Sequence, residues 1–184
     1  MFLKPRETDL DIKSLANRKN MTLLPVKDAL ERILDVFKTL PAIHIPLDKS
    51  VGRILAEDIN AKTDLPIFDN SSMDGFALLA SDVTQAGSAT LVTLEVVDDI
   101  PAGKMPTKHL RSGEAARIMT GAPLPPGADA VVPVEETDFN DRAPGTALPE
   151  KVKIYKAAKL GANIRKRGDD IREGASILPR GQRL

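Results

Sequence analysis

The clearest periodic pattern of hydrophobic and polar positions lies between Pro25 and Pro41, in the stretch PVKDALERILDVFKTLP. Its apolar side chains recur three and four residues apart, which is the spacing of one face of an α-helix. Proline is tolerated in the first turn of a helix and ends a helix further on, so the two prolines bound the predicted element. We expect a packing helix, and a helix that binds a partner stays open as the alternative. The apolar stripe comprises Ala29, Leu30, Ile33, Leu34 and Phe37.

After Pro41 the pattern changes to short runs rich in Ile, Val, Leu and Thr, with Gly, Pro or Asp between them. Such runs, separated by turn residues, are typical of a β-rich fold. Long helical patterns do not alternate with them, which disfavours a doubly wound parallel sheet. Residues 1–20 are polar and lack periodicity, so we predict a mobile N-terminal arm there. The predicted strands lie within residues 42–47, 52–59, 90–99, 114–119, 129–137 and 151–157.

The composition narrows the classes of function. The chain has 184 residues, 42% of them hydrophobic, with 26 basic and 26 acidic side chains, so its formal net charge is zero. A balanced charge and few aromatic residues give no indication of nucleic-acid or membrane binding. The sequence has no cysteine, and its two histidines, His44 and His109, are far apart, so a zinc site is not expected. Without a long apolar run or a signal peptide, the expected location is the cytoplasm.

Basic residues gather near the end of the sequence. From Lys151 to Leu184 there are ten Lys or Arg and three Asp or Glu, and the densest part is NIRKRGDD. Two interpretations stay open. The segment binds an anion, or its charges belong to a solvated strand edge, where Lys and Arg prevent unwanted pairing. The final stretch, GASILPRGQRL, reads as a strand and a turn that lead onward, which suggests a fragment of something longer.

The stretch LPIFDNSSMDGFAL, residues 65–78, concentrates small oxygen-bearing side chains. An EF-hand loop is excluded, because counting from Asp69 puts Met73 at position 5 and Ala80 at position 12, where ligands are needed. Asp69, Asn70 and Ser71 can coordinate a hard cation or bond a ligand. The alternative is an Asx-type turn in which Asp69 or Asn70 bonds its own backbone and Gly75 supplies a positive φ. On the residues alone both remain open.

A second polar turn follows the predicted strand at residues 114–119, in IMTGAPLP. Thr120 and Gly121 can present a hydroxyl and bare backbone N–H groups to a ligand. The alternative is a strand end stiffened by Pro123 and Pro125. The nearby GAPLPPG is not a P-loop, because Ala128 follows its last glycine in place of lysine.

Three blocks occur in order: LPIFDNSSMDGFAL, RIMTGAPLPPGADAVVPVEET and GANIRKRGDDIREG. Together they resemble the N-terminal region of the molybdopterin molybdenumtransferase family, which includes MoeA and the gephyrin E domain. The resemblance extends over residues 24–184. It implies catalytic roles for Asp69, Thr120 and Asp170. It places Phe76 where many relatives carry Tyr and Asp169 where many carry Glu. Cofactor-binding candidates in the same blocks are Asn70, Ser71, Asp74, Gly121, Arg165 and Arg167.

The resemblance also implies the chemistry. Family enzymes insert molybdate into adenylated molybdopterin and release AMP with the help of Mg²⁺. They act as homodimers whose cleft lies between the N-terminal region of one subunit and an α/β domain of the other. Other proteins of molybdenum cofactor biosynthesis are candidate partners. The alternatives are a non-catalytic scaffold or dimerisation module and an anion-binding module.

For the fold we expect a β-rich α+β class, as an elongated two-domain fragment with an inserted all-β domain. Residues 21–60 and 145–184 are predicted to form a discontinuous α+β domain. Residues 61–144 are predicted to form the inserted β-rich domain. Asp69 and Asp170 can share a site only if the last segment folds back beside the FDNS turn or if they meet across a dimer.

Overall fold

The computed structural model describes residues 23–87, 89–139 and 146–184. The chain divides into two compact units, Met1–Pro46 and Leu47–Leu184. The arm predicted over residues 1–20 lies outside the described residues, and the discontinuous domain over residues 21–60 and 145–184 stays a prediction. No helix in the described part of the chain is long and apolar enough to cross a membrane.

The first unit contains one described helix, α1 (Val26–Val36), which confirms the helix predicted between the two prolines. It begins directly after Pro25, whose carbonyl accepts a hydrogen bond from the Ala29 N–H at 3.0 Å. It ends at Val36, five residues before Pro41, because Phe37 adopts an extended conformation. The apolar stripe is not buried among the residues that the structure describes: Ile33 and Leu34 are 55% and 59% exposed.

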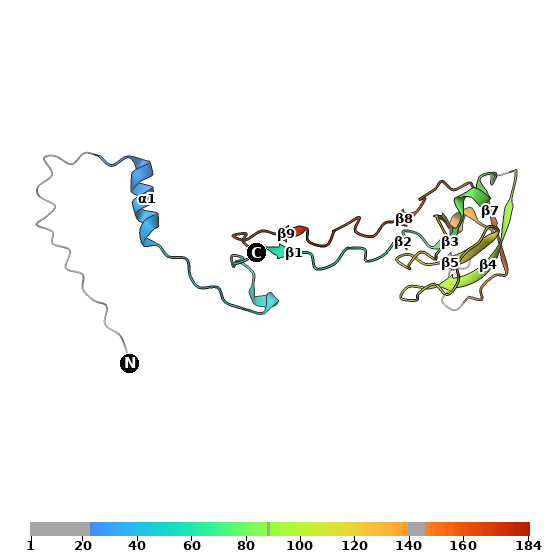
Figure 1. Cartoon of the computed structure of the whole chain (residues 1–184), viewed down its shortest axis with the longest axis horizontal. Coiled ribbons are helices and arrows are strands. Elements are labelled where there is room, and N and C mark those ends of the chain that lie inside the picture. The colour runs from blue at the N-terminus through green and yellow to red at the C-terminus, as the bar shows by residue number, and fades with distance from the viewer. Residues whose placement is uncertain (1–22, 88, 140–145) are drawn as a thin grey trace, which may run out of the picture. The chain divides into compact units, whose positions relative to one another are not determined.

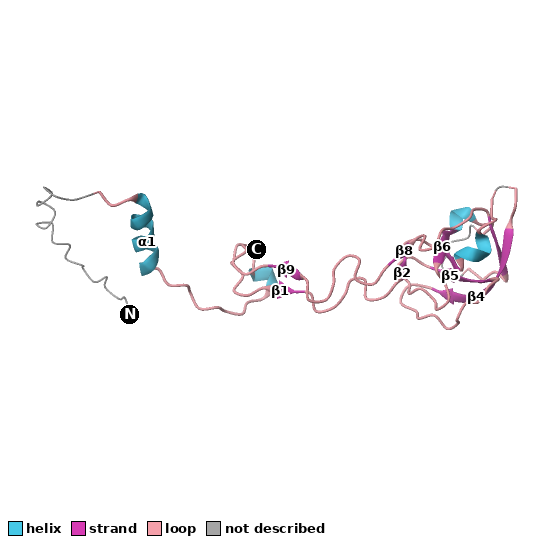
Figure 2. Ribbon diagram, turned by 45° about the horizontal axis from the view of Figure 1, so that its top comes forward, coloured by secondary structure: helices cyan, strands magenta, loops and turns pink. Residues whose placement is uncertain are grey.

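The second unit is built on a five-stranded sheet of order β6-β3-β5-β4-β7 (Figures 1 and 2). All neighbouring strands are antiparallel except β4 and β5, which are parallel. Four strands confirm the runs predicted from residue 90 onward, and β3 arises from the GFAL end of the FDNS stretch. Their bounds are β3 (Gly75–Leu78), β4 (Val92–Ile100), β5 (Glu114–Ile118), β6 (Ala130–Pro133) and β7 (Lys151–Ile154).

Both faces of this sheet are buried, and each supports its own hydrophobic cluster. Alternate residues of a strand point to opposite faces, so Phe76 and Leu78 pack on one side of β3 and Ala77 on the other. Short 3₁₀ helices, η4 (Ala80–Val83) and η5 (Val134–Glu136), follow β3 and β6. The outer strands are also paired: Thr137 bridges Ile154 of β7, and the β6 residue Val131 donates its N–H to the Ala162 carbonyl.

Outside the sheet, the outgoing segment 54–71 pairs antiparallel with the returning segment 164–183 (Figure 1). Two short ladders mark this ribbon: β1 (Ile59–Asn60) with β9 (Ser176–Leu178), and β2 (Asn70–Ser71) with β8 (Ile164–Arg165). An isolated bridge, Leu65 to Ile171, lies between them. Residues 42–47, predicted as a strand, form none, and only the 3₁₀ helix η3 (Leu47–Lys49) begins there. The run 52–59 contributes only its last residue to β1.

Candidate functional site

The FDNS turn lies between the two other sequence blocks, the one that contains TGAP and the one that contains RKRGDD. On one side, the Gly121 N–H donates to the Ser71 carbonyl at 2.8 Å and the Leu124 N–H to the Asp69 carbonyl at 2.9 Å. On the other side, β2 pairs with β8. Three polar segments, residues 69–71, 120–124 and 164–170, which we call the three-turn region, are therefore held together by backbone hydrogen bonds. They come from distant parts of the sequence.

The Asp69 carboxylate faces the returning segment. One oxygen accepts a hydrogen bond from Lys166 Nζ at 2.8 Å, and the other accepts the Arg167 N–H at 2.8 Å. The bond from the Lys166 side chain, followed by the Arg167 backbone bond, lowers the pKa of Asp69 below its ordinary value of 3.8, although partial burial opposes the shift. Asp69 is therefore ionised at neutral pH. From the sequence, Lys166 was expected to act beside Asp170 and on phosphate together with Arg165 and Arg167, and its bond to Asp69 was not predicted.

Asn70 and Ser71 are buried and locally bonded. The Asn70 side-chain oxygen accepts a hydrogen bond from Arg165 Nε at 3.0 Å. The Ser71 hydroxyl donates to the Met73 carbonyl at 2.5 Å and closes the turn. Ser71 thus forms the local hydroxyl turn, whereas the proposed Asx turn through Asp69 or Asn70 is wrong, because their side chains bond residues 165–167.

Gly75 does not supply a positive φ; that part of the turn prediction is wrong. It lies in β3 instead, where a Cβ atom would stand 2.0 Å from the Val132 carbonyl oxygen. Glycine is required there because two strands approach too closely for any side chain. The glycines with positive φ in the three-turn region are Gly121, at +81°, and Gly168, at +75°.

Asp74 and Thr120 contact each other directly. One carboxylate oxygen of Asp74 accepts both the N–H and the hydroxyl of Thr120, each at 2.7 Å. Thr120 is exposed, so its hydroxyl oxygen is accessible from the solvent side. Thr120 and Gly121 therefore form an exposed polar turn at the end of β5.

The basic candidates are largely engaged within the chain. Arg167 Nε bonds Asp64, and the Asp64 carboxylate also accepts the Glu173 N–H at 2.8 Å. The Glu173 bond, followed by that from Arg167, lowers the pKa of Asp64. Neither Asp64 nor its bonds were anticipated from sequence, because the partners are more than 100 residues apart. Arg165 and Arg167 still carry terminal guanidinium nitrogens that make no further bond to the described residues.

Asp170 lies on the same returning segment, where its N–H donates to the Leu65 carbonyl at 2.9 Å. Its exposed carboxylate makes no hydrogen bond or ion pair within the described residues. The neighbouring Asp169 closes the turn instead, accepting the Lys166 N–H at 2.7 Å. The fold-back needed for a shared site is present, since residues 164–167 lie beside the FDNS turn, although the Asp170 carboxylate does not contact Asp69.

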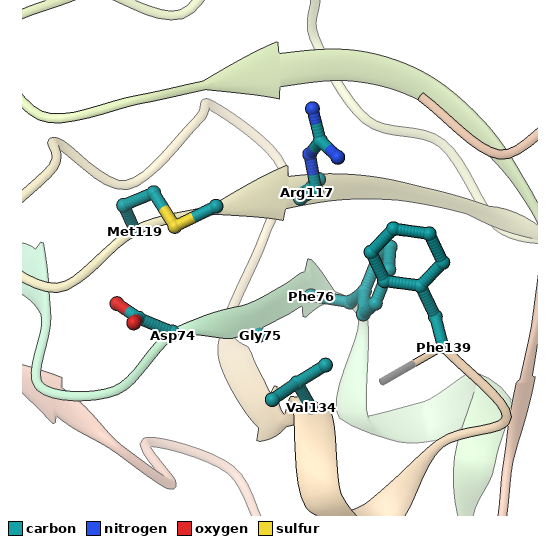
Figure 3. Close-up of a pocket in the computed structure, with 7 residues that line it drawn as sticks. All are labelled: Asp74, Gly75, Phe76, Arg117, Met119, Val134 and Phe139. Carbon is teal, nitrogen blue, oxygen red and sulfur yellow. The ribbon is translucent and has the colours of Figure 1, made fainter. Parts of the chain in front are cut away.

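A small cavity of about 10 Å³ lies behind Asp74 and Gly75 (Figure 3). That volume holds about one water molecule, so it is no substrate pocket. Phe76 and Phe139 line it with their rings edge to face, 5.9 Å apart, and Arg117 lies 5.7 Å from the Phe139 ring centre. Because Phe76 is fully buried here, its lack of a hydroxyl is accommodated by apolar packing. A larger hollow of about 530 Å³ beside β4 is lined by residues 95–97, 107–109, 111 and 114, and by none of the candidates.

The described residues contain no group of three or more His, Asp or Glu side chains placed to hold a metal ion. Magnesium is commonly bound through one or two carboxylates, with water and substrate phosphates completing its shell. The Asp69 carboxylate is paired with Lys166, and the Asp170 carboxylate is exposed. The three-turn region therefore fits at most a partial set of magnesium ligands.

Comparisons with known proteins agree with this arrangement. A molybdopterin molybdenumtransferase from Staphylococcus aureus is 40% identical over 159 residues, covering 86% of this chain and 36% of that protein. Molybdopterin molybdenumtransferase 2 from Mycobacterium tuberculosis is 39% identical over 150 residues, covering 82% of this chain and 35% of that protein. The chain thus spans about 36% of the length of the curated relatives it matches.

The crystal structure of the molybdopterin biosynthesis moeA protein from Pyrococcus horikoshii superposes with a TM-score of 0.74 at 32% identity, covering 89% of this chain and 41% of that one. The family model described as MoeA N-terminal region (domain I and II) matches residues 24–184. This match includes all three blocks that meet in the three-turn region. The chain therefore belongs to the MoeA family and corresponds to its N-terminal region.

Proposed function

We propose that this chain is the N-terminal part of an enzyme of molybdenum cofactor biosynthesis that inserts molybdate into adenylated molybdopterin and releases AMP. The names of its relatives support this function. The observation that carries it is the convergence of three polar turns, far apart in sequence, into one region in which Thr120, Lys166 and Asp170 are exposed. The names of the relatives do not favour the alternative of a non-catalytic scaffold or anion-binding module. The cytoplasmic location expected from the sequence belongs to the same proposal.

The proposed roles follow from what each side chain still offers. Asp69 supplies a fixed negative charge, Thr120 an exposed hydroxyl oxygen, and Asp170 a carboxylate that contacts none of the described residues. Gly121 leaves space for a ligand to approach, because nothing lies within 4 Å of the position its Cβ would take. Arg165 and Arg167 are proposed to meet phosphate through their terminal nitrogens, which suit paired contacts with oxyanions.

Asn70, Ser71 and Asp74 support the three-turn region from within, since their side chains are bonded to neighbouring residues. A magnesium ion, when bound, would neutralise phosphate charge on the substrate. Asp69 and Asp170 are the side chains here that would contribute to its shell. The fold offers no complete cage for the ion among the described residues.

The proposal includes a homodimer. The α1 stripe is exposed, with Leu30 54% and Phe37 70% accessible, and an apolar face of this kind on a helix is typical of a protein contact. Catalysis needs groups placed around the whole substrate, and the three-turn region provides one wall. Residues 1–184 alone are therefore expected not to insert metal. Other proteins that make the cofactor are proposed as transient partners.

The test compares Asp170→Asn with Asp169→Asn in the complete protein that carries this chain. Adenylated molybdopterin and molybdate are supplied, and AMP release and molybdenum incorporation are measured. Asp170→Asn is expected to lower the rate at an unchanged melting temperature, because its carboxylate makes no hydrogen bond or ion pair with the described residues. Asp169→Asn, the control, should lower the melting temperature and affect the rate less. A wild-type protein that releases no AMP and incorporates no molybdenum would refute the proposed function.

A further inference from the structure

The contact between Asp74 and Thr120 has a defined polarity. A carboxylate can only accept hydrogen bonds, whereas a threonine hydroxyl has one hydrogen to donate and two lone pairs. The 2.7 Å distance from Thr120 Oγ1 to Asp74 Oδ1 therefore commits the hydroxyl hydrogen to Asp74. The Thr120 N–H donates to the same oxygen at 2.7 Å, which holds the residue from two atoms. What remains on the exposed side of Thr120 is an oxygen with its lone pairs.

The surrounding structure keeps this pair in place. Asp74 directly precedes β3, and its carbonyl accepts the Val134 N–H at 3.0 Å. Thr120 lies two residues beyond the end of β5, and β5 pairs with β3 through Gly75 and Ile118. Gly75 also pairs with Pro133 of β6, and a Cβ atom at this position would lie 2.0 Å from the Val132 carbonyl oxygen, so β3 and β6 pack closely here. Both partners are therefore positioned by the sheet rather than by a loose loop.

The cavity behind Asp74 adds a low-polarity environment. Its walls include Phe76, Val134 and Phe139, and it is too small for bulk water (Figure 3). The pair itself is accessible to solvent, since Thr120 is exposed, so the cavity borders only the inner side of Asp74. The apolar wall thus lies on the inner side of the pair, and the open side faces the three-turn region.

We propose that Asp74 is a positioning residue that fixes the Thr120 hydroxyl as a hydrogen-bond acceptor, so that Thr120 meets an electron-poor group of the substrate complex and not an oxyanion. This inference rests on the proposed function. The electron-poor group is an N–H or O–H of the substrate or a cation held by its phosphates. Phosphate and molybdate oxygens are excluded from this position, because a lone pair and a nearby carboxylate both repel them.

A matched control exists at the other end of β5. There Asp82 accepts the Ser112 hydroxyl and the Gly113 N–H, each at 2.8 Å, which reproduces the chemistry of the Asp74 pair. None of these three residues belongs to the three-turn region. Substitutions at Asp82 and Ser112 therefore show what the loss of such a hydrogen-bonded pair does to the folded protein when no residue of the three-turn region is affected.

The experiment is a double-mutant cycle on AMP release in the complete protein, with Thr120→Val and Asp74→Ala. Thr120→Val removes the hydroxyl and is expected to lower kcat/KM about 10- to 100-fold, the range for losing a hydrogen bond to a charged or polarised group. Asp74→Ala removes the acceptor oxygen, so the Thr120 hydroxyl hydrogen is no longer held and a similar loss is expected. The double variant should lose no more than either single one. Thr120→Ser should restore activity, and Asp82→Ala with Ser112→Ala should leave it unchanged.

The magnesium dependence separates the two sources of the electron-poor group. If Thr120 contacts a cation, the Thr120→Val variant should need a higher magnesium concentration to reach its half-maximal rate. If Thr120 instead contacts an N–H or O–H of the substrate, the same variant should show a higher KM for the adenylated substrate. Losses that multiply in the double variant would overturn the inference, as would wild-type or higher activity for Asp74→Ala.

A second readout does not depend on catalysis. In NMR spectra of the protein, the Thr120 amide proton should move on acid titration and stop moving in Asp74→Asn. A Thr120 amide proton that moves on acid titration in Asp74→Asn as it does in the wild type would overturn the inference by itself. An inactive wild-type protein with the expected NMR response would refute the proposed function and leave the pairing intact.

Discussion

Replacement of Asp69 by Asn separates the structural from the functional importance of the FDNS turn. The change keeps the shape of the side chain and an oxygen that still accepts the Arg167 N–H, but it removes the charge that faces Lys166. The expected result is a large loss of metal insertion with a small loss of stability.

The magnitude follows from the exposure of the ion pair. The Lys166 and Asp69 side chains are 59% and 39% exposed, so solvent screens their attraction. Exposed pairs of this kind contribute about 0.2–1 kcal/mol. In a chain of this size 1 kcal/mol shifts the melting temperature by about 2–4 °C, which is the largest shift expected. A lost charge-assisted contact with the substrate costs about 1.5–3 kcal/mol, or roughly 10- to 150-fold in kcat/KM.

The assay measures AMP release and molybdenum incorporation by the complete protein, and thermal unfolding by calorimetry. Asp64→Asn is the matched control, because Asp64 lies on the same ribbon and also accepts a side-chain and a backbone hydrogen bond from the returning segment. It should change stability in the same direction and leave activity nearly unaltered. A melting temperature that falls well beyond 4 °C, with normal specific activity per folded molecule, would refute a functional role for Asp69.

Three further predictions concern the fold. Asp98→Ala should lower the free energy of unfolding, measured in urea, by about 3 kcal/mol or more, because the backbone N–H groups that now donate to the buried Asp98 carboxylate would lose their acceptor. A loss under about 1 kcal/mol would contradict this. Gly75→Ala should prevent folding or lower the free energy of unfolding by more than about 3 kcal/mol, whereas Gly87→Ala should be tolerated, because Gly87 has open space around it and no positive φ. Equal stability of the two variants would show that the strands around Gly75 can move apart to accept a side chain. The depressed pKa values of Asp64 and Asp69 mean that their contribution to stability is present above pH 3.8 and lost as the pH falls through the lower folded-state values. Unfolding free energy should therefore drop in this acidic range, and the double variant Asp64→Asn/Asp69→Asn should flatten that drop; an identical slope in both proteins would exclude these carboxylates as the cause.

The sequence by itself determined the local elements whose signal is local. The apolar spacing over residues 25–41 predicted α1, and the β-branched runs predicted β4 to β7, because side-chain periodicity matches one type of backbone. The three polar blocks were also visible, and their resemblance to a family identified the region that matters.

Only the tertiary structure decided how those elements pair and which polar groups are already bonded. The ribbon strands β1, β2, β8 and β9 have two or three residues each and carry no periodic pattern. They form only by pairing with strands that lie about 95 or more residues away in the sequence. Likewise, Asn70 bonds Arg165 and Asp69 bonds Lys166 because the chain returns antiparallel beside itself. Such contacts depend on register, and shifting one strand by a single residue would exchange every partner. The division between internally bonded groups and those left for a ligand, such as the Thr120 oxygen and the Asp170 carboxylate, is therefore a property of the folded chain.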